Sequence, residues 1–126
     1  VGARVFASLE QSLRAVPVIN LDTLDEKGRL YLVSHDSGGE RLARALEPHL
    51  ARLGLPIRQR RLPWGILVDS LPLARRGARA VTVGRLTWGT LRRIHTPRDT
   101  LEDLSLSTAD RVGQAIAEFD LSSAAE

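Results

Sequence analysis

Two kinds of hydrophobic pattern alternate along this chain, and their order constrains the fold more than any other feature. Apolar residues recur every three or four positions in three stretches, as on one face of a helix: residues 2–16, 36–54 and 107–119. Shorter apolar runs, typical of strands, lie between them at residues 17–22, 29–35, 55–62 and 78–86. Strands that alternate with helices favour an α/β fold built in layers.

Local signals predict where some of these elements begin and end. Ser37 and Glu40 fit a capping box, in which each side chain satisfies a free amide at a helix start. Gly54 fits the stop position of the same helix. The strands at 17–22 and 29–35 flank a short turn, so we expect a hairpin or a pair joined by a tight loop.

The chain has the size of one domain. It has 126 residues, 43% of them apolar, and it contains no linker, internal repeat or low-complexity segment, so residues 1–126 are predicted to form a single domain. No apolar run approaches the roughly 20 residues of a membrane span. Arg58 and Arg60 share one face of their strand, which indicates a solvated face or an edge. A sheet of about four strands leaves an edge that invites self-association or domain swapping.

Charge and missing residue types exclude several functions. The net charge is +3, carried almost entirely by arginines that are interleaved with Asp and Glu along the chain, so we do not expect nucleic-acid binding. The absence of Cys excludes disulfides and thiolate metal ligands and leaves the compartment undecided. The absence of Met means that the chain has no initiator, so we expect a portion of a longer protein.

Two residues are candidate metal ligands, each with a plainer alternative. Asp22 ends the strand at 17–22, where ligands of α/β sheets gather, although Asp also opens turns. His95 follows the strand at 78–86, and imidazole is a common zinc ligand, but an isolated histidine can equally be structural. Thr96 and Asp99 either orient this imidazole or form the turn after it.

Other polar residues have readings that the sequence leaves open. Asp69 is either the cap of a short helical turn or a carboxylate that faces the same cleft. The stretch "HDSGGE" at 35–40 is explained by helix capping, with anion binding as the alternative. A hydrolase triad of Ser70, His95 and Asp99 is conceivable, but the sequence lacks a Gly-x-Ser-x-Gly elbow.

Three stretches, taken in order, resemble the co-catalytic di-zinc aminopeptidases, a family that includes bacterial leucyl aminopeptidase, the glutamate carboxypeptidase type and the animal glutaminyl cyclases. "VINLD" resembles the strand that ends in a zinc-ligand aspartate, here Asp22. "VDSLPLARRGARAVTV" resembles the Ser/Asp-Asp-His-x-Pro-Phe segment, with Asp69 at the aspartate. "IHTPRDTLEDL" resembles the closing His-Thr-x-x-Asp-Thr, with His95 at a ligand of the second zinc. The resemblance covers nearly the whole chain.

The resemblance implies a three-layer αβα fold with a mixed, mostly parallel sheet. It implies part of a zinc-dependent exopeptidase that hydrolyses peptide or aminoacyl substrates by a metal-activated water. Asp22 and His95 would be metal ligands, and Asp69, Thr96 and Asp99 would lie behind the ligands and orient them. The family's His-x-Asp motif, bridging Asp and Glu-Glu pair, whose first Glu is the general base, are expected upstream of Val1.

The departures from the family pattern define the alternatives. Ser70 stands where the family usually has His. Because Asp22 and His95 would serve different zinc ions, the isolated chain is expected to bind zinc weakly or not at all and to be inactive. The alternative is a degenerate, non-catalytic member that acts as a binding or interaction module. A cyclase on the same scaffold is a third possibility.

Overall fold

The structure is a computed structural model that describes residues 2–9, 13–25, 27–62, 68–94, 96–98, 100 and 106–120. Its elements in chain order are α1 (Gly2–Leu9), β1 (Pro17–Leu24), β2 (Arg29–Ser34), α2 (Ser37–Ala51), β3 (Ile57–Arg61), α3 (Ser70–Ala74), β4 (Arg79–Leu86), α4 (Trp88–Arg93) and α5 (Ser107–Ala117). Strands and helices alternate, and the α/β prediction is confirmed.

The four strands form one sheet in the order β1-β4-β2-β3. β1 is parallel to β4, β2 is parallel to β3, and only β2 and β4 are antiparallel. The sheet is therefore mixed and mostly parallel, as expected. The hairpin prediction is wrong, because β4 lies between β1 and β2. β4 lies inside the sheet and is buried on both faces, with Ala80, Val81 and Val83 inaccessible to solvent.

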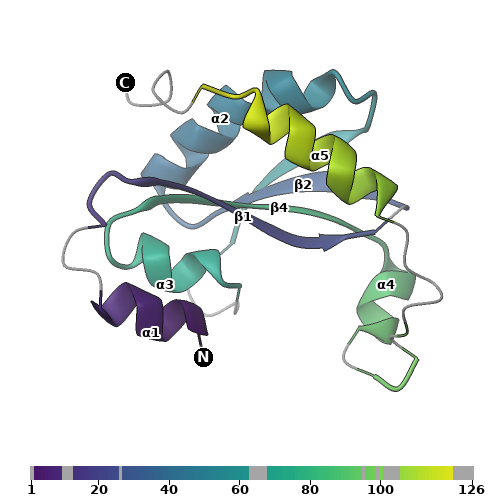
Figure 1. Cartoon of the computed structure of the whole chain (residues 1–126), viewed down its shortest axis with the longest axis horizontal. Helices are drawn as coiled ribbons and strands as arrows, with labels where there is room; N and C mark the ends of the chain where they lie inside the picture. The colour runs from purple at the N-terminus through teal and green to yellow at the C-terminus, as the bar shows by residue number, and fades with distance from the viewer. Residues whose placement is uncertain are drawn as a thin grey trace.

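Helices cover both faces of the sheet, so the fold has three layers (Figure 1). α1 and α3 lie against one face, and α2 and α5 lie against the other. The main core lies under α2 and α5, and its fully or nearly fully buried members are Leu30, Leu32, Leu42, Ala43, Leu46, Leu50, Val81, Val83, Val112 and Phe119. A smaller cluster of Ala7, Leu13 and Ala78 lies on the opposite side.

Helix ends differ in detail from the sequence predictions. The cap of α2 is Asp36, whose carboxylate accepts a hydrogen bond of 2.8 Å from the amide of Gly39, so the predicted cap at Ser37 is one residue late. Both residue types accept such a bond, and local sequence does not choose between neighbours. Gly54 has φ of +70°, which suits the predicted stop. The predicted first helix is shorter than expected, since α1 ends at Leu9.

The two outer strands differ in character. β3 is an edge strand, and its Arg58 and Arg60 side chains are exposed, as the sequence predicted. β1 forms the other edge of the sheet among the described strands. In the part of the chain that the structure describes, no helix is long and apolar enough to cross a membrane.

Candidate functional site

The end of β1 carries a strained irregularity. Leu21 pairs with Val83 and Leu24 pairs with Arg85, so the register shifts between them and Asp22 and Thr23 form a bulge. Thr23 has φ of +52°, a left-handed conformation that costs a non-glycine residue on the order of 1 kcal/mol. Bulges and strained residues of this kind are concentrated at functional sites, where they direct a side chain.

Asp22 projects from this bulge and is exposed. The Thr23 hydroxyl donates a hydrogen bond of 2.9 Å to Asp22 Oδ1. The backbone of Asp22 lies very close to Gly84 of β4. A Cβ atom at residue 84 would be only 2.8 Å from the Asp22 carbonyl oxygen. The carboxylate keeps acceptor sites for a further ligand, since an ionised carboxylate offers about four.

The chain leaves β4 at the same end of the sheet. Because β1 and β4 are parallel, the carboxyl end of β4 lies beside Asp22. A short helix, α4, follows, and the sequence analysis did not predict it; a capping box of Thr87 and Thr90 starts it. His95 and Asp99, the predicted ligand and its partner, lie outside the described residues.

Thr96 is described, and it takes part in the turn after α4. Its hydroxyl donates a hydrogen bond of 2.5 Å to the Arg93 carbonyl oxygen and accepts one of 3.2 Å from the Arg98 amide. Its role behind the metal ligands stays a prediction.

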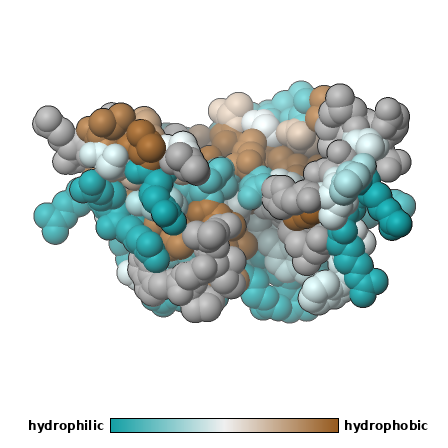
Figure 2. Space-filling model, turned by 90° about the horizontal axis from the view of Figure 1, so that it is seen from below, coloured by the Kyte–Doolittle hydropathy of each residue, from teal (hydrophilic) through white to brown (hydrophobic). Residues whose placement is uncertain are grey.

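Asp69 occupies the cap position of α3, but its side chain makes no capping hydrogen bond. It lines a groove of about 850 Å³ between α1 and α3, together with Arg4, Arg75 and Arg76. Figure 2 looks onto the face that carries α1 and α3, where hydrophilic and apolar side chains lie side by side. Among the described residues no hydrogen bond or ion pair joins Asp69 to Asp22, and its expected role stays a prediction.

A chain of hydrogen-bonded polar side chains, all buried except the half-buried Asn20, crosses the sheet next to the bulge. The Asn20 amide donates to the Thr82 hydroxyl at 3.2 Å, which donates to the Ser70 hydroxyl at 2.7 Å. Ser70 is hydrogen-bonded at 3.1 Å to His35 Nε2. Burial lowers the pKa of His35; the Leu62 backbone and Asp36 oppose this shift. The histidine is therefore neutral at pH 7.

This buried chain bears on two earlier interpretations. Ser70 is fully buried, so no substrate reaches its hydroxyl, and the triad with Ser70 as nucleophile is wrong. At the position where the resemblance places a histidine, the serine instead joins α3 to β4 and to His35. The contacts were not predicted, although Thr82 interrupts the apolar run of β4 and marks a polar group turned toward α3.

The described residues do not form a zinc site on their own. A catalytic zinc takes about three protein ligands. Among the described residues, no three His, Asp or Glu side chains are grouped closely enough to hold a metal ion, and Asp22 is the single described member of the predicted ligand pair. Of the two predicted ligands, the described residues therefore supply only the Asp22 carboxylate, which is exposed on the strained bulge of β1.

No curated protein and no solved structure matches the chain significantly. The four-strand α/β architecture is consistent with the fold of one peptidase family whose members typically bind zinc. The model of that family, peptidase family M28, matches residues 1–120, and the chain belongs to it.

Proposed function

We propose that this chain is a portion of a zinc-dependent exopeptidase of the aminopeptidase type, which hydrolyses peptide or aminoacyl substrates, and that the isolated chain does not hydrolyse them. The chain belongs to family M28, and one observation supports the proposal most: Asp22 is exposed on a strained bulge at the carboxyl end of β1. Zinc, when bound, acts as a Lewis acid in peptide hydrolysis.

In this proposal each named residue has a distinct task. Asp22 supplies a carboxylate ligand to one metal, and His95 supplies an imidazole to the other. Asp69, Thr96 and Asp99 orient the ligands, since outer partners fix the position and tautomer of a ligating histidine. The family's remaining ligands and general base, which the resemblance places upstream of Val1, would complete both sites, since two ligands aimed at two ions hold neither one tightly.

The test is an assay of the isolated chain with excess zinc and aminoacyl p-nitroanilides. We expect no release of nitroaniline above that of zinc in buffer alone. The Asp22→Asn variant is the matched control, because it removes one negative charge and keeps the side-chain shape. If the isolated chain showed metal-dependent turnover, and Asp22→Asn abolished that turnover, the proposed inactivity would be contradicted.

A second candidate function has its own supporting observation. Ser70 is buried and hydrogen-bonded within the fold at the position where the resemblance places a histidine, which favours a degenerate member used as a binding module. The residues encoded before Val1 decide between the two. A Glu-Glu pair directly before Val1, with His-x-Asp further back, supports the hydrolase, and their absence supports the binding module.

We also propose self-association through the edge of β1. β3 protects its edge of the sheet with Arg58, Arg60 and Arg61, whereas residues 17–21 of β1 carry no charge. An uncharged edge pairs readily with another strand. Sedimentation equilibrium is expected to show dimers that dissociate on dilution, and a monomer at every concentration would contradict this proposal.

A further inference from the structure

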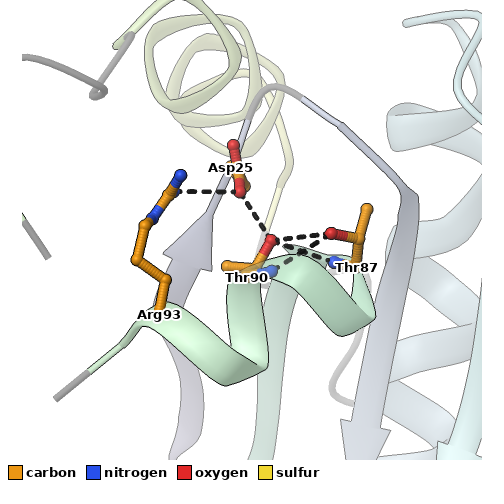
Figure 3. A network of polar contacts seen from close by, with 4 residues as sticks. All are labelled: Asp25, Thr87, Thr90 and Arg93. Carbon is orange, nitrogen blue, oxygen red and sulfur yellow. Dashed lines mark hydrogen bonds and ion pairs between the residues drawn. The ribbon is translucent and has the colours of Figure 1, made fainter. Parts of the chain in front are cut away.

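Asp25 connects the end of β1 to α4 through two side chains of that helix (Figure 3). Its Oδ2 atom accepts a hydrogen bond of 2.6 Å from the Thr90 hydroxyl and lies 3.5 Å from Arg93 Nη2. The Asp25 amide donates to the Arg85 carbonyl oxygen at 2.8 Å, so the backbone of Asp25 is fixed to β4. Thr90 and Arg93 are one helical turn apart, so they present the same face of α4 to this carboxylate.

The contact with Asp25 helps to hold this short helix in place. α4 has six residues, whereas isolated helices shorter than about 12–15 residues are marginal in water, so packing must hold it. Trp88 is 81% exposed and Arg92 is exposed, so neither side chain supplies that packing. Thr90 is buried, and the Asp25 side chain is only 19% exposed, which strengthens the hydrogen bond between them.

The segment after α4 is tied to the same helix. The Ile94 amide donates to the Thr90 carbonyl oxygen at 3.0 Å. The Thr96 amide and hydroxyl both donate to the Arg93 carbonyl oxygen, at 3.1 and 2.5 Å. Ile94 and Thr96 are the neighbours of His95 in the sequence, so a movement of α4 moves the residues on both sides of His95.

We propose that Asp25 is a positioning residue that holds Ile94 and Thr96, the two neighbours of His95 in the sequence, in a fixed relation to the end of β1, which carries Asp22. One carboxylate, three residues after one proposed metal ligand, thereby aligns the described residues on both sides of the other. The inference rests on the proposed function for the roles of Asp22 and His95. The alignment itself needs no metal.

Backbone order parameters of the ¹⁵N-labelled, metal-free chain test the inference. In the unaltered chain the Ile94 and Thr96 amides are expected near the rigid value of about 0.85. In Asp25→Ala they are expected to fall below about 0.6, the range of flexible segments. Leu62, whose amide donates to the Ser34 carbonyl oxygen, reports on the rest of the fold and is expected to stay unchanged.

Conservative variants separate positioning from a general structural role. Asp25→Asn keeps an oxygen that accepts from Thr90 and is expected to restore most of the rigidity lost in Asp25→Ala. Thr90→Val removes the donor to Asp25 together with the oxygen that accepts from the Thr87 amide in the capping box, and is expected to loosen Ile94 and Thr96 as Asp25→Ala does. Thr87→Ala is the matched control, because it removes the capping hydroxyl but keeps the bond between Thr90 and Asp25, and it is expected to leave both amides rigid. If Asp25→Ala does not fold, Thr90→Val carries the test.

Two results would overturn the inference. One is unchanged order at Ile94 and Thr96 in Asp25→Ala and Thr90→Val. The other is an equal loss at Leu62, which would make Asp25 a support of the whole fold. These order parameters are measured without zinc, so they test the positioning role of Asp25 alone. The proposed metal binding is tested separately, by a zinc titration of the chain and its Asp22→Asn variant.

Discussion

Gly39 lies in the first turn of α2, where the helix approaches the backbone of β4. A Cβ atom on residue 39 would be 2.3 Å from the Ala80 carbonyl oxygen and 3.1 Å from Ser34 Cβ. Contacts of Cβ shorter than 3.0 Å are essentially never seen in proteins, so Gly39→Ala must move α2 about 0.7 Å away from the sheet. The obstacle belongs to the backbone of a central strand and cannot rotate away.

The cost of this shift exceeds the gain in helix propensity. Replacing Gly by Ala in a helix stabilises by at most about 1 kcal/mol. Overpacking costs about 1–3 kcal/mol and occasionally more, and here the shift also loosens the contacts of the buried Leu42 and Leu46. We expect a net loss of about 2 kcal/mol in the free energy of unfolding.

Urea denaturation followed by circular dichroism measures this loss. With the usual dependence on urea for a small domain, the midpoint should fall by about 1 M. Gly113→Ala in α5 is the matched control, because a Cβ there meets nothing within 4 Å, and it should raise stability by about 0.5–1 kcal/mol. A Gly39→Ala midpoint at or above that of the unaltered chain would refute the close approach of α2 and β4.

Three further predictions concern the buried polar chain and the surface. Burial lowers the pKa of His35, so the unfolded chain binds a proton more readily than the folded one. The free energy of unfolding should therefore fall as the pH drops below about 6.5. Urea midpoints should show a steeper fall in the unaltered chain than in His35→Asn. Ser70→Ala should lower stability by about 1–3 kcal/mol, because Thr82 and His35 each lose a hydrogen bond. Ser70→His should lower the Tm at least as much, because the site is fully buried and has no room for a larger side chain. An unchanged Tm for both variants would contradict these contacts. Glu40→Gln removes the exposed ion pair with Arg61 at 3.3 Å and should change stability by less than about 1 kcal/mol, so a larger loss would show that the pair is stronger than its exposure indicates.

Local periodicity predicted most elements of this fold, although not α4, and it did not predict their arrangement. The apolar spacing in α2 and the alternation in β4 are properties of neighbouring residues, and both elements were predicted close to their bounds. The place of β4 between β1 and β2 depends on pairing between residues far apart in the sequence, which no single segment reveals. The predicted hairpin was wrong for that reason.

The candidate site divides in a similar way. Asp22 was identified from its place at a strand end and from the resemblance, and the structure adds the bulge and the strained Thr23. Asp25 had no local signal, because its partner Thr90 is 65 residues further along the chain. The short helical turn after Asp69 was predicted and is confirmed as α3, but the burial of Ser70 against His35 depends on tertiary packing.

The affinity of the isolated chain for zinc, measured by competition with a chromophoric chelator, tests the proposed incomplete metal site most directly. We expect weak binding, with no stoichiometric site, and a further loss in Asp22→Asn, because Asp22 and His95 alone are too few ligands to hold either ion. Stoichiometric binding of zinc at submicromolar concentration, unaffected by Asp22→Asn, would contradict both the incomplete site and the role of Asp22 within it.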